Sequence, residues 1–508
     1  MDKQRTLGAA LSYAAQFVQI FVNLIYTPVM LRLVGQSEYG LYQMVYSVVV
    51  NLSLLTFGFS SAYNRFYFRC RANSDDAGIA SLNGMFITVF SCLAVVAALA
   101  GSGLVFNIET ILGSNMTVSE MSTARILMII MVVNLVLTFP ISVFDCYVTS
   151  QERFVFQKIL IILQQILSPV ITLPLLLLGY GSIAIISVAT ALSVANLLVK
   201  IYYCFAKLNM QISFRGFRFA LLWEMAAFTF FVFLNQIIDQ VNWSIDKFLL
   251  GRFVNTTAVA IYGVAGSINA MYLQFSTAIS NVFVPRVNAL VAQREGDGEL
   301  TRVFTKVGRV QFFVMSLVLI GFISLGKPFL CLWVGKEYAE SYVVALFLIV
   351  PVTIPLIQNL GIEIQRAKNM HQMRSIVYSL VAVGNILLSI PLIKHFGAVG
   401  ASVGTAVSLL IGNALFMNWY YHKRVGLNMF FFWKEILSIL PSLFLPCMVG
   451  AAIMHFASIT NWLQFFICGA VIVLIYAFSV YMWGLNSVEN DLLRSVVNSV
   501  INRFRRNR

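Results

Sequence analysis

The chain has 508 residues, of which 59% are hydrophobic and only 11% are charged, and its formal net charge is +14. Because an average soluble domain is about 25% charged, a deficit along the whole length excludes an ordinary soluble protein and predicts a polytopic membrane protein. A basic net charge is also typical of nucleic-acid binding, but the placement of the charges along this chain argues against it.

Apolar segments long enough to cross a bilayer, about 20 residues each, recur along the chain. We place fourteen, near residues 7–33, 40–63, 80–106, 122–149, 156–178, 182–204, 222–250, 258–283, 306–326, 342–365, 374–393, 397–420, 436–456 and 461–484. The first is too long for the apolar region of a cleavable signal peptide, and no small-residue cleavage site follows it. Since the connections are short, we expect an all-α polytopic membrane protein with about 14 transmembrane helices and no sizeable soluble domain.

Lys and Arg residues concentrate on one side of the predicted membrane. With both termini in the cytoplasm, 27 of the 34 basic residues fall on inside segments, as the positive-inside rule requires. This bias explains the net charge without nucleic acid. The terminal "RFRRNR" is then a juxtamembrane basic patch for anionic membrane lipid.

The cysteines and histidines show no pattern of a metal or redox site. Seven cysteines are scattered singly, mostly inside apolar segments, where a free thiol acts as a small apolar side chain. The four histidines, His371, His395, His422 and His455, lie far apart and lack the spacing of metal ligands. We therefore expect no metal and no cofactor.

The chain repeats itself at one offset. "LVGQSEYGLY" resembles "LLGRFVNTTAVAIYG", and "LLGYGSIAIISVATALS" resembles "KHFGAVGASVGTAVSLL". Two glycines and one proline recur at offsets of 216, 216 and 215, namely Gly35 with Gly251, Gly181 with Gly397, and Pro140 with Pro355. This register predicts two parallel six-helix repeats related by an axis along the membrane normal. The expected domains are residues 1–215 and 216–434, an extra helix pair 13 and 14 in 435–484, and a basic cytoplasmic tail in 485–508.

The seventh segment contains "LNQIIDQVNWSIDKFLLGRF", residues 234–253, which carries too many polar groups for a lipid-facing helix. Asn235, Asp239, Asn242 and Asp246 follow at +4, +3 and +4, so they share one helical face. An Asp at the centre of a membrane helix costs about 2.5–3.5 kcal/mol on insertion scales. We therefore expect this face to meet protein or a water-filled cavity.

The two acids of this helix have different predicted roles. Asp239 lies near mid-depth without an obvious partner, so we predict that it couples transport to a bound H⁺ or Na⁺ ion. Asp246 lies about two turns outward, and we interpret it as a near-interface acid paired with Lys247. Two other acids are of interest: Asp145 has no evident partner, and Glu363, one turn before Lys368, is expected to pair locally.

The first helix carries a matching polar stripe. Its members follow at +3, +4 and +3, and they are Gln16, Gln19, Asn23 and Tyr26. The repeat offset places Asn235 and Asn242 of helix 7 on Gln19 and Tyr26. Two such helices favour a substrate cavity between the halves, because amides and hydroxyls suit sugar hydroxyls. The alternative is that these groups form hydrogen bonds between helices and only hold the bundle together.

Four short motifs, "RLVGQSEYGLYQ", "DKFLLGRF", "FGFSSAYNRF" and "SQERF", carry a family resemblance over the whole chain. The chain resembles the polysaccharide-exporter branch of the multidrug/oligosaccharidyl-lipid/polysaccharide (MOP) superfamily, the Wzx-type O-antigen flippases. The resemblance implies two MATE-like six-helix bundles around a cavity that opens alternately to either side of a bacterial inner membrane. The implied substrate is an oligosaccharide on undecaprenyl diphosphate, moved outward for surface polysaccharide biosynthesis, with polysaccharide assembly proteins as partners.

A diphosphate needs cations, and two arginines end helices on the predicted cytoplasmic side. Arg65 and Arg286 correspond at an offset of 221, so they could bind the diphosphate together at the inner mouth of the cavity. The alternative is simple positive-inside anchoring. In the lipid II flippase branch an extra helix pair forms a lateral groove for the lipid tail, which implies the same role for helices 13 and 14, or a merely structural one.

Other functions stay open at this point. A drug or cation antiporter of the same superfamily usually has twelve helices, so the extra pair and "SQERF" favour the polysaccharide branch. A membrane polymerase or ligase needs a large outer loop with catalytic groups, whereas the longest outside loops here, near 107–121 and 327–341, are short and lack histidine. A scaffold protein would not need two matching polar faces. We expect a transporter and no enzyme.

Overall fold

The computed structural model describes residues 2–56, 59–113, 116–214, 223, 233, 236–237, 240, 244–293, 296–368, 370, 372–487 and 489–491. All regular secondary structure within these ranges is helical. Helices satisfy their own backbone N–H and C=O groups, which is what an apolar surrounding demands. The all-α prediction is therefore confirmed.

The elements up to residue 207 are long helices with few interruptions. They are α1 (Asp2–Val34), α2 (Gln36–Val49), the 3₁₀ helix η1 (Val50–Thr56), α3 (Phe59–Ala72), α4 (Asp76–Phe106), α5 (Ile108–Leu112), α6 (Val118–Ser150), α7 (Phe154–Leu177), α8 (Gly181–Tyr202) and the π-helix η2 (Tyr203–Lys207). The segment predicted near 40–63 is not one regular helix, because η1 separates α2 from α3.

The later part begins with a helical stretch at residues 244–253. The elements that follow are α10 (Thr256–Ala292), α11 (Asp297–Trp333), η3 (Lys336–Tyr338), α12 (Ser341–Ile357), α13 (Leu360–Ala367), α14 (Gln372–Leu409), η4 (Leu410–Met417), α15 (Asn418–Tyr420), η5 (Tyr421–Val425), α16 (Met429–Leu437), α17 (Leu440–Phe456), α18 (Trp462–Ser479) and η6 (Val480–Gly484).

Nine of the described helices are long and apolar enough to cross a membrane, or up to eleven if two bent pairs each form one span. One of the nine, Met373–Val425, has 53 residues, and a straight helix of that length would measure about 80 Å. Gly397 interrupts it with φ 57° and ψ −133°, which is where the sequence predicts one span to end and the next to begin. The total of fourteen stays a prediction.

The glycines that define the repeat differ in backbone conformation. Gly181 and Gly397 both have a positive φ, 56° and 57°, so these two repeat positions share a conformation that favours glycine. Gly35 has φ 82° between α1 and α2, whereas Gly251 lies within the helical stretch 244–253. Asn255 takes the place of Gly35 before α10, where its Oδ1 accepts from the Ala258 N–H at 2.8 Å.

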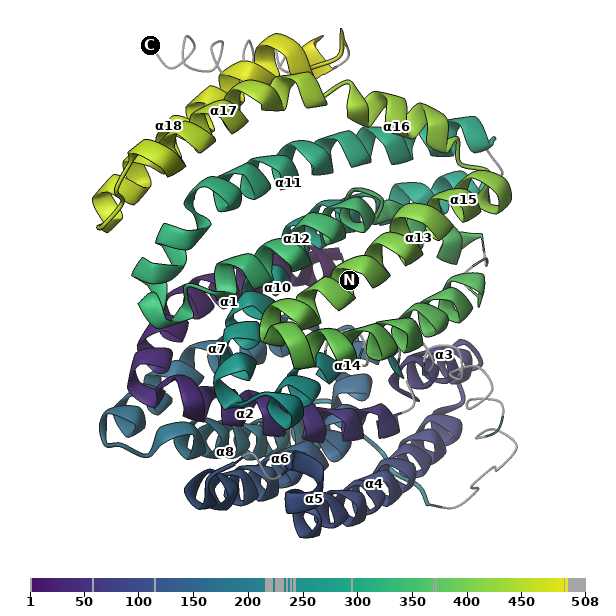
Figure 1. Ribbon diagram of the computed structural model, residues 1–508. Helices are drawn as coiled ribbons and strands as arrows, with labels where there is room; N and C mark the ends of the chain where they lie inside the picture. Colours follow the sequence, from purple (N-terminus) through teal and green to yellow (C-terminus); the bar gives the residue numbers. More distant parts are fainter. Residues whose placement is uncertain are drawn as a thin grey trace, which may run out of the picture. The chain divides into compact units, whose positions relative to one another are not determined.

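The chain forms two compact units. One contains Met1–Val264 and Ser375–Thr405, and the other contains Ala265–Arg374 and Ala406–Arg508. In the first unit α1 packs along α7, and α6 lies between α4 and α8 (Figure 1). In the second unit α11 packs against α12, α16, α17 and α18 (Figure 1). The six-helix domains expected from the sequence, with boundaries at residues 215 and 434, stay a prediction.

Candidate functional site

Asp246 is a completely buried carboxyl group whose hydrogen bonds, within the described residues, come from two hydroxyls. It is 0% exposed. Its Oδ2 accepts from the Tyr262 hydroxyl of α10 at 2.7 Å and from Thr405 Oγ1 of α14 at 2.8 Å. Its Oδ1 has no hydrogen-bond partner within the described ranges. A carboxylate beside two hydroxyls is a set of hard oxygen atoms that can hold a proton or a hard cation.

Lys247 does not pair with Asp246, so that prediction is wrong. Consecutive helical side chains point about 100° apart, which sends the two groups to different neighbours. Lys247 Nζ donates to Gln43 Oε1 at 2.9 Å, and Gln43 Nε2 donates to the Tyr39 hydroxyl at 2.7 Å. The lysine ammonium therefore lies beside α2 with neutral polar groups around it.

The polar stripe of α1 lies on a helix that packs along α7. Gln16 and Gln19 are exposed, whereas Asn23 and Tyr26 are half-buried. The Tyr26 hydroxyl forms a hydrogen bond with the Thr172 side chain of α7. One end of the stripe thus contacts a neighbouring helix, and the amides of Gln16 and Gln19 remain accessible.

The matching stripe of helix 7 cannot be compared in the same way. Asn235, Asp239 and Asn242 lie outside the described residues. The cavity wall and the ion-coupling role of Asp239 therefore stay predictions.

The starts of α2 and α10 touch each other, and we call this place the α2–α10 contact. A Cβ at Gly40 would overlap the Thr256 carbonyl oxygen, so the two backbones meet directly. Ser37 Oγ and Thr256 Oγ1 lie 2.9 Å apart. Glu120 of α6 accepts from both hydroxyls, at 2.7 and 3.2 Å. In the predicted topology this contact lies on the outer side.

The two arginines predicted to bind diphosphate are both accessible. Arg65 is exposed on α3, in the first unit, and Arg286 is exposed on α10, in the second. Their exposure leaves both side chains accessible to solvent. Their meeting at one cavity mouth stays a prediction.

Two ion pairs correct the sequence analysis. Asp145 does have a partner: Lys200 Nζ lies 2.6 Å from its Oδ1, and Lys200 itself is buried. Glu363 pairs locally as expected, but with Arg366 at 2.7 Å. Lys368 instead contacts Asp297 at 2.6 Å. Across the described part of the chain, no group of three or more His, Cys, Asp or Glu residues could hold a metal ion.

The helix pair formed by α16–α17 and α18 packs on α11 and leaves a small hollow there. Buried Ile320 and Leu325 of α11 form one cluster with Ile472 and Tyr476 of α18. Between α11 and α17 lies an apolar hollow of about 80 Å³. It is lined by Ile320, Ile323, Ser324, Cys447, Gly450, Ala451 and Met454. We call this hollow the α11–α17 groove.

Sequence comparison gives one family match and two informative relatives. The model of a family described as "Polysaccharide biosynthesis protein" matches residues 7–291. The uncharacterized membrane protein EpsK of Bacillus subtilis (strain 168) is 23% identical over 525 aligned positions, covering 99% of this chain and 98% of that protein. The probable flippase AglR of Haloferax volcanii is 27% identical over 179 positions, 34% of this chain and 37% of that protein.

Solved structures share the fold. The lipid II flippase MurJ in an inward closed conformation superposes with a TM-score of 0.75 and 16% identity, covering 96% of this chain and 100% of that one. An inward-facing multidrug resistance MATE transporter of the MOP superfamily gives 0.65 and 14%, covering 82% and 96%. The predicted MATE-like fold is thereby confirmed. Because the family model covers more than half of its residues, this chain belongs to the polysaccharide biosynthesis protein family.

Proposed function

We propose that this protein is a flippase that moves an undecaprenyl-diphosphate-linked oligosaccharide from the cytoplasmic to the outer leaflet for surface polysaccharide biosynthesis. The observation that carries the proposal is the family match over residues 7–291. The names of the lipid II flippase MurJ and the probable flippase AglR support the same class of activity. Turning a lipid over breaks no covalent bond, so the proposal needs no catalytic residue. An O-antigen precursor is one such substrate.

The substrate has three chemically different parts, and the chain offers a different surface for each. For the glycan we propose the amides and hydroxyl of α1 and helix 7, which are Gln16, Gln19, Asn23, Tyr26, Asn235 and Asn242. For the diphosphate we propose Arg65 and Arg286, whose planar guanidinium groups suit phosphate oxygens. For the isoprenoid tail we propose the α11–α17 groove, since its lining is almost entirely apolar.

We further propose alternating access in which the α2–α10 contact is the outer closure. Opening to the outside then separates Ser37 from Thr256, two hydroxyls that lie 2.9 Å apart. Thr256 begins the same helix, α10, whose Tyr262 donates to Asp246. An H⁺ or Na⁺ ion that binds Asp246 changes the charge that Tyr262 faces, which links ion binding to the position of α10. Asp246 therefore joins Asp239 as a proposed coupling site.

The proposed setting is the cytoplasmic membrane of a bacterium, with both termini inside. The basic tail would then lie against anionic lipid, and polysaccharide assembly proteins would receive the product outside.

The test is to delete the gene and to analyse both the surface glycan and the lipid-linked intermediates. We expect loss of the glycan and accumulation of an undecaprenyl-diphosphate-linked precursor, with restoration by the intact gene. Normal glycan with no accumulated precursor would sink the flippase proposal. A variant with both Arg65→Ala and Arg286→Ala should fail to complement although it is inserted, and full complementation would reduce both arginines to topology signals.

A multidrug antiporter is the second candidate, because the MATE transporter shares the fold. Efflux of cationic dyes from cells that overproduce the protein distinguishes the two functions. Robust efflux that Asp246→Asn or Asp239→Asn abolishes would favour the antiporter, and efflux at the background rate would favour the flippase.

A further inference from the structure

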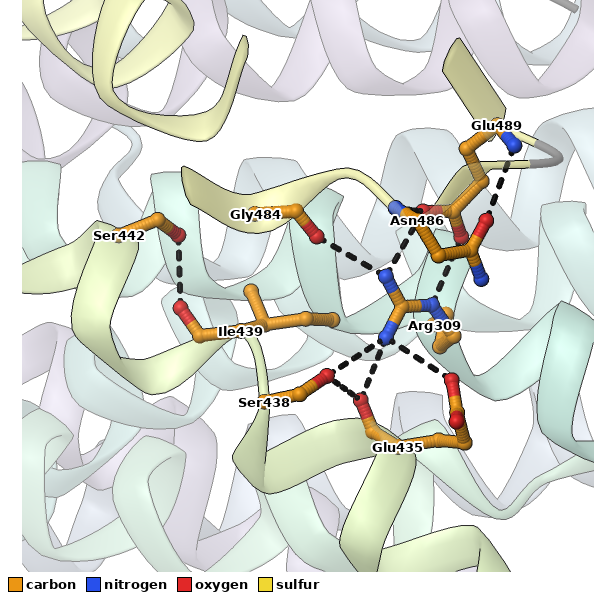
Figure 2. Close-up of polar contacts among 8 residues, drawn as sticks. All are labelled: Arg309, Glu435, Ser438, Ile439, Ser442, Gly484, Asn486 and Glu489. Carbon is orange, nitrogen blue, oxygen red and sulfur yellow. Dashed lines mark hydrogen bonds and ion pairs between the residues drawn. The ribbon is translucent and has the colours of Figure 1, made fainter. Parts of the chain in front are cut away.

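Arg309 of α11 is a buried arginine that binds three separate segments (Figure 2). Its Nε and one terminal nitrogen donate to the two carboxylate oxygens of Glu489 at 2.8 and 2.7 Å. That same terminal nitrogen also donates to the Gly484 carbonyl at 2.9 Å. The other terminal nitrogen donates to the Glu435 carbonyl at 2.6 Å and to Ser438 Oγ at 3.0 Å. We call this arrangement the Arg309 clamp.

The Arg309 clamp lies where helix 13 bends. The axes of α16 and α17 differ by 41°. At the bend the Ile439 N–H donates to Ile436 O, three residues back, and so leaves the Glu435 carbonyl without its usual helical partner. Arg309 and the Ser438 hydroxyl both donate to that carbonyl, at 2.6 and 2.8 Å. The clamp therefore completes the hydrogen bonding of the bend and fixes the start of α17 against α11.

The same guanidinium also fixes the end of helix 14. Gly484 is the last residue of η6, and Glu489 follows shortly after it. Asn486 and Glu489 bind each other reciprocally, since each side chain accepts the other's backbone N–H, at 3.0 and 2.9 Å. This bracing orients the carboxylate toward Arg309. A planar guanidinium with five N–H donors can satisfy all the acceptors of the Arg309 clamp. The ammonium group of lysine has three donors and cannot.

Two further contacts hold the pair along α11, and the groove lies beyond them. The Tyr476 hydroxyl is 2.8 Å from both Ser316 Oγ and the Phe313 carbonyl. Farther along, α17 approaches α11 so closely that a Cβ at Gly450 would overlap Ser324 Oγ. The groove begins at Ile320, eleven residues or about 16 Å beyond Arg309. A change in the angle of α17 at the clamp is therefore expressed as a change in the width of the groove.

We propose that Arg309 is a positioning residue for substrate: it sets the spacing of the α11–α17 groove and so determines the affinity for a long isoprenoid tail. This inference rests on the proposed function, which assigns the groove to that tail. Arg309 itself touches no substrate, because Glu435, Glu489, Ser438 and Gly484 occupy its donors. Loss of Arg309 should weaken the binding of polyprenyl diphosphates more as their tails become longer. It should leave recognition of the diphosphate group unchanged.

The test uses the full chain in lipid nanodiscs and a photoreactive polyprenyl diphosphate that cross-links to the peptide 440–456. Undecaprenyl diphosphate and geranyl diphosphate compete with it, and the concentration for half-maximal competition is measured. For Arg309→Lys we expect that concentration to rise about tenfold for undecaprenyl diphosphate, which corresponds to about 1.4 kcal/mol. It should stay unchanged for geranyl diphosphate, because we expect its short tail to end before the groove when the diphosphate is bound. Glu489→Gln, which keeps the arginine, should give a smaller rise in the same direction.

The matched control is Arg302→Lys on the same helix, since that arginine is 79% exposed and pairs with nearby Glu299. It should change neither concentration. Equal weakening of both lipids by Arg309→Lys would mean a loss of folded protein and would overturn the positioning role, as would an unchanged curve. If the groove is not a lipid site, the wild-type chain itself shows no competition by undecaprenyl diphosphate, and the proposed function fails separately from the role of Arg309.

Discussion

Asp246 and Arg309 are both buried charges in predicted membrane helices, yet their surroundings are opposite. Arg309 has every donor engaged and two carboxylates beside it, Glu435 and Glu489. Asp246 has two neutral hydroxyls on one oxygen, and its other oxygen accepts no hydrogen bond from the part of the chain that the structure describes. A fully satisfied buried charge acts as a brace, because any movement would break several bonds at once. An incompletely satisfied one is suited to bind and release an ion.

A cross-link should therefore stop transport at the α2–α10 contact, on the helix that carries Tyr262, but not at the Arg309 clamp. A disulfide between Ser37→Cys and Thr256→Cys joins the α2–α10 contact, and we expect complete arrest of transport that a reductant reverses. A disulfide between Ser442→Cys and Gly484→Cys, where a Cβ at Gly484 would lie 3.3 Å from Ser442 Cβ, joins helices 13 and 14 beside the Arg309 clamp. Transport should continue. Flipping by proteoliposomes, oxidised and then reduced, measures both.

Arrest by the second disulfide as well would remove the distinction between a moving contact and a fixed clamp. Continued transport with the first disulfide fully formed would mean that the α2–α10 contact stays closed during the cycle. The controls are the variants that carry only one of the two introduced cysteines, since they cannot form the designed cross-link.

Removing the charge of Arg309 should lower the stability of the folded protein. Arg309→Met keeps an unbranched apolar side chain but removes the guanidinium that two carboxylates and two carbonyls bind. Breaking a buried ion pair in this way costs about 3–5 kcal/mol. The free energy of unfolding in detergent should fall by about that amount, whereas Arg302→Met should change it by less than about 0.5 kcal/mol. A loss below about 1 kcal/mol for Arg309→Met would show that the clamp is not a brace.

The sequence predicts the fold well because composition and periodicity act on whole helices, but it predicts the two charges poorly. Asp246 was assigned to Lys247 because the two are adjacent, although adjacent helical positions face different neighbours. Its true partner Thr405 lies 159 residues away, a pairing that no local pattern contains. For Arg309 a signal existed: it lies inside the segment predicted near 306–326, where a charge needs a partner.

The repeat was the most informative sequence signal and also the source of one error. Its offset of 216 finds Gly181 and Gly397, which share a positive φ. It also aligns Gly35 with Gly251, although only Gly35 stands between two helices. Asn255 caps α10 with its side chain and so replaces the glycine with different chemistry. Alignment by residue type therefore pairs Gly35 with Gly251, whereas the residue in the same structural position is Asn255.

Removing the charge of the ion site should cost transport and not stability. Asp246→Asn keeps the shape of the side chain and replaces the carboxylate with a neutral amide. The substitution therefore removes the cost of burying a charge without a cation. We expect transport to fall by about tenfold, equivalent to about 1.4 kcal/mol, with the free energy of unfolding unchanged or raised. Flipping in proteoliposomes and unfolding in detergent are measured on the same preparations. Asp297→Asn, at an exposed acid paired with Lys368, is the matched control and should change neither. Destabilisation like that of Arg309→Met would make Asp246 a second brace.

The smallest effect is expected at the acid of the α2–α10 contact. Glu120→Gln keeps one acceptor for the hydroxyls but loses the charge and the reciprocal cap with Thr117, which weakens the contact by about 1 kcal/mol. A cysteine pair at Met44 and Gly251, whose side chain and backbone touch, reports closure and leaves both hydroxyls in place. With Glu120→Gln the disulfide should form about fivefold more slowly, as that free energy implies. Glu109→Gln, at an exposed acid that pairs with Arg125, should leave the rate unchanged. An equal rate in both variants would mean that the backbone contact at Gly40 holds the closure and that the carboxylate adds nothing to it.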